Sequence, residues 1–391
     1  MASDLGRSAG QIDRRTLAIY GGYALAFAVV GLANLIGLDP LPRFGLCVIG
    51  LAAGAIAVGE STERLSERLS PGATGVVQSI LGNLPELFLA VFALQAGLVG
   101  VVAAALIGSV LGNALFVLGL ALLAGGLRHG RLLFSKAANR LYSTELLLAV
   151  AALLVPFLAT RAGEPDVGHE VELSTVVAVV LLVIFAIAVP IGLRIAAGQT
   201  SAGEGHQTRG ADHAAKPREV ATGPLERPLE HRRATPLGET LVLLAVSAGS
   251  SAIVAEWFVD ALQPAMASIG MSEAFAGLIV VALAGNAVEN LAGIRFAWRG
   301  RGDLAMSLIL NSALQVVLFL APVIVLLSLF IAPTPLSLIV DPLLLGALAV
   351  TAILVFAIVL DGEANALEGA MLLGLYLIVA AGVWWGPAIT A

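Results

Sequence analysis

Two short segments in this sequence place a carboxylate beside a glycine and an asparagine in otherwise apolar surroundings. Both have the pattern Gly-Asn-x-x-Glu, and Glu289 of the second follows Glu86 of the first by 203 positions. A carboxylate within sequence of membrane-spanning character is energetically costly and usually functional. Two of them in matching contexts predict a duplicated ion site at the interface between two repeats. The motif residues are Gly82, Asn83 and Glu86, followed by Gly285, Asn286 and Glu289.

The glutamates of the two motifs supply the hard, anionic oxygens that Ca²⁺ prefers, about six to eight of them at about 2.3–2.6 Å. Glu86 and Glu289 are therefore expected to bind the metal ion, with the amide oxygens of Asn83 and Asn286 beside them. Two carboxylates held together in a low-dielectric site resist being charged at once, so loss of the cation should favour proton uptake. One pair of side chains can thus carry either ion, as antiport requires. Ca²⁺ is then a transported substrate, and no cofactor is expected.

The first motif has the local sequence of a helix that stops and restarts. Gly82 permits unusual backbone angles, Asn83 is a favoured helix N-cap, and Pro85 suits the first turn of a new helix. A break of this kind inside a membrane is tolerated only where it faces protein or a cavity. The freed backbone carbonyls can then join the carboxylate around a cation. The second motif lacks the proline but keeps the other three residue types.

Small polar residues recur on the helices that should follow each motif. A spacing of three or four residues places such side chains on one face of a helix. They can line the ion site with hydroxyl and amide oxygens, or they can serve only as contacts between helices, where small and amide residues are common in membranes. Their presence at similar positions in both repeats favours the first interpretation. They are Ser109 and Asn113 after the first motif, and Ser312 and Gln315 after the second.

The composition of the chain requires a membrane around these motifs. The 391 residues are 59% hydrophobic and 12% charged, with a mean hydropathy of +0.96. Runs of about 18 or more apolar residues predict membrane spans. The expected fold class is therefore an all-α integral membrane protein with about 11 transmembrane helices. Their expected spans are 16–37, 42–61, 74–97, 101–127, 139–160, 173–197, 236–262, 273–298, 303–332, 336–360 and 365–386.

Basic residues alternate between the segments that connect these spans. With the N-terminus in the cytoplasm, 19 of the 21 Lys and Arg residues fall on the cytoplasmic side, as the positive-inside rule predicts. The third span then runs outward and the eighth runs inward, so the two motifs cross the membrane in opposite senses. This is the pattern of two five-helix units related by a pseudo-two-fold axis in the membrane plane, with one extra helix at the N-terminus.

The inverted repeat divides the chain into four expected regions. Residues 1–40 form the N-terminal tail and the extra helix, 41–197 the first repeat, 198–235 a cytoplasmic linker, and 236–391 the second repeat. The linker is rich in Gly, Ala, Thr, Pro and mixed charge, which is typical of a flexible segment. Its three histidines have no compact metal-ligand spacing, so a solvated linker is favoured over a metal site.

Two further glutamates lie at the ends of apolar runs outside the motifs. Glu60 lies near the expected inner end of the second helix, and Glu256 near the expected outer end of the seventh. The two glutamates lie near opposite ends of their helices in the two repeats, as the inverted symmetry predicts. They can therefore bind protons at the inner and outer mouths of the routes to the ion site. Alternatively, each marks a helix end at the membrane surface.

Several motifs thus occur together in the two halves. The first half holds Gly59-Glu60-Ser61-Thr62-Glu63, Gly82-Asn83…Glu86 and Gly108-Ser109…Gly112-Asn113, and the second holds Gly285-Asn286-Ala287-Val288-Glu289 and Ser312…Gln315. Over about residues 51–127 and 239–327, the sequence resembles the cation/proton exchanger branch of the calcium/cation antiporter superfamily. The resemblance implies Ca²⁺/H⁺ exchange by alternating access, with Glu86 and Glu289 as the central pair.

Two residues depart from that family pattern. Asn290 stands where the family usually has a histidine, and Pro85 gives a Pro-Glu pair more like that of the sodium/calcium exchanger branch. A sodium-coupled Ca²⁺ exchanger and a Na⁺/H⁺ antiporter therefore stay as alternatives.

An intramembrane enzyme would also bury carboxylates, but the sequence has no His-Glu-x-x-His motif. Inverted repeats with broken helices are more typical of a transporter that works by alternating access than of a channel.

The remaining expectations concern location and partners. The polar N-terminus leads into an apolar segment without a small-residue cleavage site, so no removable signal peptide is expected. The single cysteine, Cys47, excludes an intrachain disulfide. A bacterial plasma membrane is the expected location, with the lipid bilayer and inorganic cations (Ca²⁺, H⁺ and in the alternatives Na⁺) as partners. No nucleic-acid partner is expected, and the sequence leaves the oligomeric state open.

Overall fold

The computed structural model describes residues 14–66, 68–69, 77, 80–161, 168–206 and 236–384. At some helical positions, Glu289 and residues 189–206 among them, it describes the backbone only. The first half contains α1 (Arg14–Leu35), α2 (Pro40–Ser66), α4 (Leu84–Gln95), α5 (Val99–Leu111), η1 (Gly112–Val117), α6 (Leu118–His129), β1 (Arg131–Leu133), α7 (Lys136–Arg161) and α8 (Glu170–His206). The second half contains α9 (Leu237–Ile269), α10 (Glu273–Phe275), η2 (Ala276–Val281), α11 (Ala282–Gly285), α12 (Ala287–Trp298), α13 (Gly302–Gln315), η3 (Val316–Leu320), α14 (Ala321–Ile331), α15 (Pro342–Val359), β2 (Glu363–Asn365) and α16 (Ala366–Trp384).

The described part of the chain is a membrane-spanning helical protein. Nine of its helices are long and apolar enough to cross a membrane, or ten if the bent pair formed by residues 273–285 and 290–298 is one span. The expected fold class is confirmed, whereas the expected count of eleven is not. The span expected over 74–97 is represented mainly by the 12 residues of α4, because most of the preceding 67–79 lies outside the described residues.

Several expected span boundaries differ from the structure, including the expected end at 262, where α9 continues to Ile269. The span expected to begin at residue 336 begins instead at Pro342, because Asp341 caps α15 by accepting a 2.8 Å hydrogen bond from the Leu343 amide. Pro342 at the first helical position suits such a start. The span expected over 173–197 is longer than predicted, since α8 continues to His206. The rest of the expected linker, 207–235, lies outside the described residues.

The structure repeats itself at the offset present in the sequence. Helix α12 begins and ends 203 positions after α4 begins and ends, and α13 begins 203 positions after α5. Gly97 and Gly300, separated by the same offset, follow α4 and α12 with φ angles of 77° and 74°. These backbone angles favour glycine because it has no Cβ. The duplication therefore extends from the motifs to the helix ends and to the turns between helices.

Two of the long helices contain a π-helical turn at equivalent places. Helix α5 continues through η1 into α6, and α13 continues through η3 into α14. The two π segments end at Val117 and Leu320, again 203 positions apart. A π turn inside an α-helix carries an extra residue and is often associated with a functional site. Asn113 lies within η1, and Gln315 immediately precedes η3.

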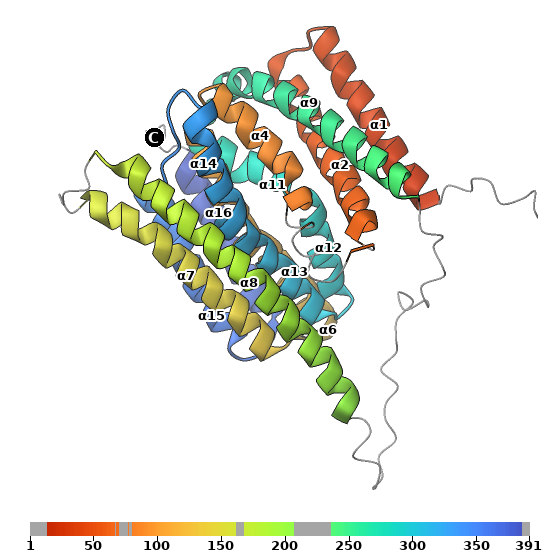
Figure 1. The fold of residues 1–391 in the computed structure, drawn as a ribbon, viewed down its shortest axis with the longest axis vertical. Coiled ribbons are helices and arrows are strands. Elements are labelled where there is room, and N and C mark those ends of the chain that lie inside the picture. Colours follow the sequence, from red (N-terminus) through yellow and green to blue (C-terminus); the bar gives the residue numbers. More distant parts are fainter. Residues whose placement is uncertain are drawn as a thin grey trace, which may run out of the picture.

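The helices form two groups with the broken helices between them. Helices α1, α2 and α9 lie together on one side, and α6, α7, α8, α13, α15 and α16 lie on the other (Figure 1). Helices α4, α11 and α12 lie between the two groups (Figure 1). The extra helix α1 is attached to the second repeat by a hydrogen bond of 2.8 Å from the Tyr23 hydroxyl to Ser250 Oγ on α9. The asparagines at the two breaks, Asn83 and Asn286, are both buried.

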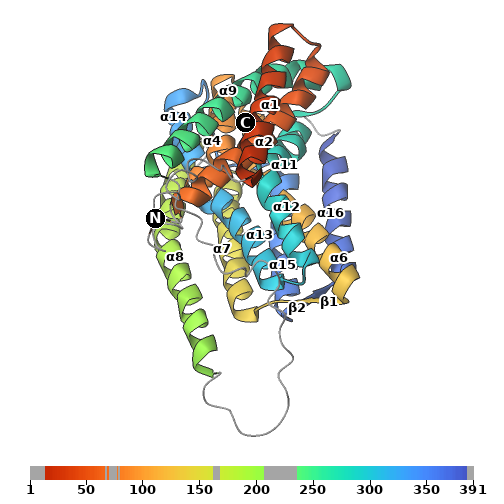
Figure 2. The ribbon, with the colours of Figure 1, turned by 90° about the vertical axis from the view of Figure 1, so that its right-hand side faces the viewer.

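A two-stranded sheet closes one end of the molecule. Strands β1 and β2 pair antiparallel, with Leu132 opposite Ala364, and they lie beside the end of α6 (Figure 2). Arg131 on β1 forms an ion pair with Glu363 on β2. Nearby, the Arg128 guanidinium lies 4.9 Å from the ring centroid of Trp298 at the end of α12, in cation–π geometry. These contacts join the first repeat to the second at the ends of their helices.

Candidate ion-binding site

Both Gly-Asn motifs interrupt their helices, as the sequence predicts. Asn83 and Asn286 have nearly the same backbone angles, φ −88°, ψ 8° and φ −91°, ψ 12°, and each directly precedes a new helix. Residues 273–285 and 290–298 meet at an angle of 64°. Neither asparagine side chain caps its helix, although Asn is a favoured N-cap residue. Their amides are directed to other helices instead, which makes them available to the site.

The centre of the site is a contact between the two repeats. The side-chain amide of Asn286 donates to Glu86 Oε1 at 2.5 Å and lies within hydrogen-bond distance of Ser109 Oγ at 3.2 Å. The same nitrogen lies 3.1 Å from the Ala282 carbonyl on its own helix. Asn286 is 5% exposed, so these bonds form away from water. Hydrogen bonds to a charged carboxylate are stronger than those between neutral groups, and Asn286 therefore holds the Glu86 side chain in place.

Two further amide contacts cross between the repeats beside this centre. Asn113 on η1 donates to Ser312 Oγ on α13 at 3.1 Å, and Asn83 donates to Gln315 Oε1 at 3.4 Å. The Ser312 hydroxyl in turn donates to Asn286 Oδ1 at 3.4 Å. These bonds connect five of the residues singled out in the sequence, which are Glu86, Ser109, Asn113, Asn286 and Ser312. Asn83 and Gln315 form a separate pair, and we call the seven residues together the polar layer.

Gly285 is required by the closeness of Glu86. A Cβ at position 285 would lie 2.7 Å from Glu86 Cγ and 2.9 Å from Glu86 Oε1, closer than real Cβ contacts. Its counterpart in the first repeat, Gly82, has nothing within 4 Å of such a Cβ among the described residues. The two glycines therefore differ in their surroundings. Gly285 leaves room for the carboxylate, whereas the described residues show no such contact at Gly82.

Close backbone packing brings the two repeats together at this level. A Cβ at Gly108 on α5 would lie 2.3 Å from the Leu278 carbonyl oxygen on η2. In the reverse direction, a Cβ at Gly277 would lie 2.3 Å from the Val101 carbonyl oxygen. Small residues of this kind allow membrane helices to approach backbone to backbone. Because α5 and η2 touch here, Ser109, the residue after Gly108, reaches Asn286 across the interface.

Glu289 occupies the first turn of α12, as Glu86 occupies the first turn of α4. The side chain of Glu289 lies outside the described residues. Its role as the second carboxylate of the pair therefore stays a prediction that rests on its position in the repeat. The backbone register, with α4 and α12 starting 203 positions apart, supports that prediction.

A cavity lies beside Glu86. About 30 Å³ of it is open to water, and it is lined by residues of α4, α5, η2, α11, η3 and α14. Among the described residues of this lining, Glu86 is the only ionisable one, and Ser109 is the only other with a polar side chain. The rest are glycine and apolar residues such as Leu89, Val102 and Leu320. A carboxylate in such surroundings holds its charge well only when a cation or hydrogen-bond donors accompany it.

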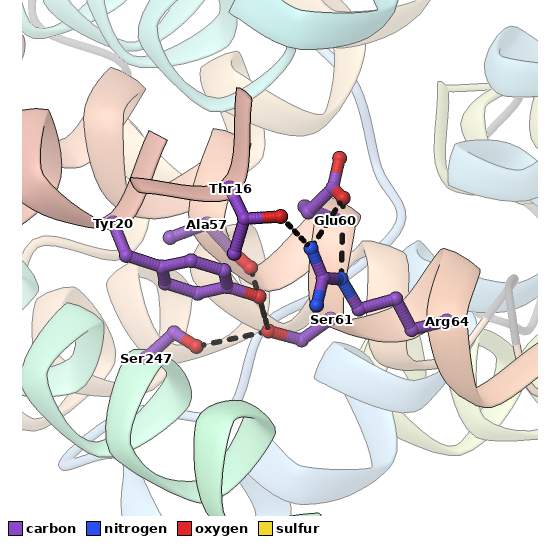
Figure 3. A network of polar contacts seen from close by, with 7 residues as sticks. All are labelled: Thr16, Tyr20, Ala57, Glu60, Ser61, Arg64 and Ser247. Carbon is purple, nitrogen blue, oxygen red and sulfur yellow. Dashed lines mark hydrogen bonds and ion pairs between the residues drawn. The ribbon is translucent and has the colours of Figure 1, made fainter. Parts of the chain in front are cut away.

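Glu60 lies in a separate polar network rather than beside the central cavity (Figure 3). Its Oε1 accepts from Arg64 Nε at 3.2 Å and from Arg64 Nη2 at 3.1 Å. Both side chains are buried, with 4% and 9% exposed. Arg64 also donates to Thr16 Oγ1 on α1. The pair therefore fastens the end of α2 to the extra helix, which the sequence interpretation did not include.

The same network extends to the second repeat through hydroxyl groups. The Tyr20 hydroxyl lies 2.8 Å from Ser61 Oγ, which donates to the Ala57 carbonyl at 2.8 Å and lies 3.2 Å from Ser247 Oγ on α9 (Figure 3). The i, i+4 spacing of Glu60 and Arg64 is the sequence signal that predicts their contact. The long-range hydroxyl contacts have no such local signal.

Glu256 differs from Glu60 in its surroundings. It lies on α9 and is exposed. It is absent from the cavity lining and from the polar layer around Glu86. The structure therefore brings together the motif and helix-face residues but keeps both Glu60 and Glu256 away from them. Proton access through these two glutamates stays a prediction.

The polar layer around Glu86 has the chemistry of a site for a hard cation. It offers a carboxylate, hydroxyl groups and amide oxygens, which suit Ca²⁺ better than soft metals. Amide side chains can present either oxygen or nitrogen to a partner by rotation. Asn286 can therefore donate to an unliganded carboxylate and present its oxygen to a bound cation. No group of three or more His, Cys, Asp or Glu side chains is positioned to hold a metal within the described part of the chain.

Comparisons with known proteins agree with this arrangement. A family model described as sodium/calcium exchanger protein matches residues 41–192 and 239–385. A Ca²⁺/H⁺ antiporter of Aphanothece halophytica is 30% identical over 376 residues, which cover 95% of this chain and 97% of that protein. A Ca²⁺/H⁺ antiporter of Synechocystis sp. is 35% identical over 349 residues, covering 88% and 90%. The solved structure of native YfkE superposes with a TM-score of 0.75 at 27% identity and covers 94% of this chain and 99% of that one.

Proposed function

Because the chain belongs to the sodium/calcium exchanger protein family, we propose that it exchanges Ca²⁺ for H⁺ across a membrane by alternating access. Its relatives named Ca²⁺/H⁺ antiporters align along nearly their whole length, which supports this reaction. The observation that carries the proposal is the Glu86 carboxylate held by Asn286 across the repeat interface. The protein is thus a transporter with Ca²⁺ as its cargo, not an enzyme with a bound cofactor.

In the proposed cycle, Glu86 carries Ca²⁺ and protons alternately. When Ca²⁺ is bound, the carboxylate is charged, and oxygens of Asn286, Ser109 and Ser312 contribute to the ligand set. When Ca²⁺ leaves, the apolar cavity around Glu86 makes a lone charge costly, so the carboxylate takes up a proton. Glu289 acts in the same way from the second repeat. The two cargoes compete for the same groups, which couples their movements.

The inverted repeats supply the two access states. Units that cross the membrane in opposite senses can exchange conformations, which opens a site between them first to one side and then to the other. The matched ends of α4 and α12 and the matched π turns support such exchange. We place the N-terminus in the cytoplasm of a bacterial cell and the protein in its plasma membrane, as the distribution of Lys and Arg favours.

The experiment is ion flux into proteoliposomes that contain the purified protein. An imposed pH gradient, acidic inside, should drive ⁴⁵Ca²⁺ uptake in the absence of sodium, and uptake should acidify the exterior. A sodium gradient at constant pH serves as the comparison, because the Pro85–Glu86 pair resembles that of sodium/calcium exchangers. Uptake driven by sodium but not by protons would replace the proposed coupling with sodium coupling. Uptake driven by neither gradient would contradict exchange altogether.

A further inference from the structure

The turn between α12 and α13 carries two arginines that its counterpart in the first repeat lacks. Its sequence is Arg299-Gly300-Arg301, whereas the turn between α4 and α5, 203 positions earlier, is Ala96-Gly97-Leu98. The two glycines have nearly equal φ angles, 74° and 77°. The backbone of this turn therefore forms equally well without arginine, so its shape does not explain the basic residues.

Two further arginines lie close to this turn. Arg295, near the end of α12, precedes Arg299 by four residues, so the two lie on one face of the helix. Arg128, at the end of α6 in the first repeat, lies 4.9 Å from the ring centroid of Trp298. The Nε2 atom of the neighbouring His129 lies 3.1 Å from the Trp298 carbonyl oxygen. Basic residues from both repeats therefore meet at this junction.

These arginines have no acidic partner within the described part of the chain. We call them the arginine cluster, which consists of Arg128, Arg295, Arg299 and Arg301; all four are exposed, and none forms an ion pair with a described residue. The nearby Arg131, in contrast, pairs with Glu363. Asp303, two residues after the turn, accepts a hydrogen bond of 2.5 Å from the Ser135 amide. The charge of the cluster is therefore available to a partner outside the chain.

Large apolar side chains lie exposed beside the arginine cluster. Leu291, one turn before Arg295 on α12, is 53% exposed, and Leu127, next to Arg128, is 71% exposed. Trp298 is 49% exposed, and tryptophan is enriched where the hydrocarbon of a membrane meets the headgroups. Arginines beside exposed apolar residues suit a lipid, which offers both a charged group and acyl chains. A soluble anion or an acidic peptide would leave the leucines uncovered.

We propose that the arginine cluster binds the phosphate group of an anionic phospholipid, whose acyl chains lie along Leu127 and Leu291. The planar guanidinium group matches phosphate oxygens with two parallel hydrogen bonds. Arg128 belongs to the first repeat and the other three arginines to the second, so one headgroup joins the two repeats. With the N-terminus in the cytoplasm, this end of the molecule lies at the cytoplasmic leaflet, where the surface is negatively charged.

The test is native mass spectrometry of the purified protein in detergent with added phospholipid. The protein should bind phosphatidylglycerol in preference to the zwitterionic phosphatidylcholine. Removing three charges of the cluster should weaken the binding of phosphatidylglycerol by about tenfold or more, because each basic residue adds to the attraction of an anionic lipid. The variant is Arg295→Gln/Arg299→Gln/Arg301→Gln.

A matched control removes three charges outside the cluster. It changes basic residues that are also exposed and that the topology places on the same side of the membrane. Its binding of phosphatidylglycerol should stay within about twofold of that of the native protein. The control variant is Arg68→Gln/Lys136→Gln/Arg140→Gln. Equal weakening in the two triple variants would show a diffuse attraction that needs only net positive charge, and it would overturn the site.

Two other results would also overturn the proposal. Equal binding of phosphatidylglycerol and phosphatidylcholine would mean that the charge is not recognised. Displacement of phosphatidylglycerol by millimolar glycerol 3-phosphate would show a site for a soluble phosphate instead of a lipid. If the triple variant of the cluster does not fold, as judged by size-exclusion chromatography, Arg128→Gln replaces it and should weaken binding by about threefold, with Arg140→Gln as its control.

The lipid measurement is independent of transport. Preferential phosphatidylglycerol binding that depends on the arginine cluster, in a protein without Ca²⁺/H⁺ flux, would refute the proposed function and leave the lipid site standing. Normal flux with no phosphatidylglycerol preference would do the reverse.

Discussion

The Asn286 amide nitrogen lies 2.5 Å from Glu86 Oε1, although 200 residues separate the two side chains in the sequence. Asn286 lies at the helix break of the second repeat. Glu86 lies in the first turn of α4, directly after the helix break of the first repeat. Through this contact, the asparagine of one repeat holds the carboxylate of the other. A change at either residue should therefore affect both the binding of Ca²⁺ and the binding of the proton.

Removing the charge of Glu86 should abolish exchange without unfolding the protein. Glu86→Gln keeps the volume and most hydrogen bonds of the side chain but cannot bind Ca²⁺ as an anion or carry a proton. Proton-driven ⁴⁵Ca²⁺ uptake in proteoliposomes should fall to background, and Glu289→Gln should behave in the same way. Glu145→Gln, at a half-buried position on α7 that does not line the central cavity, is the control and should retain uptake. Normal uptake by Glu86→Gln would refute the assignment of this residue.

Replacing Asn286 with aspartate should change the pH dependence of Ca²⁺ binding. The native amide donates a hydrogen bond to the Glu86 carboxylate, which favours its charged form. Asn286→Asp removes this donor and adds a like charge, so the pair of carboxylates should hold a proton more tightly. The midpoint pH of Ca²⁺ uptake should rise by about one unit or more, whereas binding at high pH should be as tight as in the native protein or tighter. An unchanged midpoint would show that the bond to Glu86 does not govern proton release.

The control for this prediction is Asn139→Asp. Asn139 is as buried as Asn286, but its amide bonds to the Ser135 carbonyl at the start of its own helix. This variant should leave the midpoint pH of uptake unchanged. A shift of the midpoint in both variants would mean that any new buried carboxylate alters the pH dependence.

A methyl group at position 285 should disturb the site more than one at position 82. The Cβ of Gly285→Ala would lie 2.7 Å from Glu86 Cγ, so the carboxylate must move away from Asn286. Overpacking of this kind costs about 1–3 kcal/mol, which corresponds to a loss of about 5- to 150-fold in apparent Ca²⁺ affinity. Gly82→Ala adds the same methyl group at the equivalent position of the first repeat and should have a smaller effect. Equal losses in the two variants would indicate a general sensitivity of the helix breaks.

The Glu60–Arg64 pair should contribute to stability. Breaking a buried ion pair by removing one partner costs about 3–5 kcal/mol, so Glu60→Gln and Arg64→Gln should both lower the melting temperature of the purified protein in detergent. If Glu60 also passes protons, as its position near a helix end predicts, only Glu60→Gln should change the pH dependence of uptake. Melting curves and uptake at several pH values distinguish the two roles. A melting temperature that is unchanged in both variants would contradict the structural role.

The sequence by itself determined the membrane class and the repeat, and it predicted the central residues. These features depend on local composition and on a fixed offset, both of which can be recognised without a fold. The sequence also predicted the helix breaks, because glycine, asparagine and proline have strong local backbone preferences. It did not locate the start of α15, since Asp341 and Pro342 overrode an apolar run that continues on both sides of them.

Only the tertiary structure decided which side chains meet. The paired motifs suggest equal roles for Asn83 and Asn286, yet the first bonds to Gln315 and the second to Glu86. The difference arises because Gln315 and Asn113 have no polar counterparts at the equivalent positions, which are Gly112 and Val316. Such contacts join residues far apart in the chain, and local sequence preferences do not encode them.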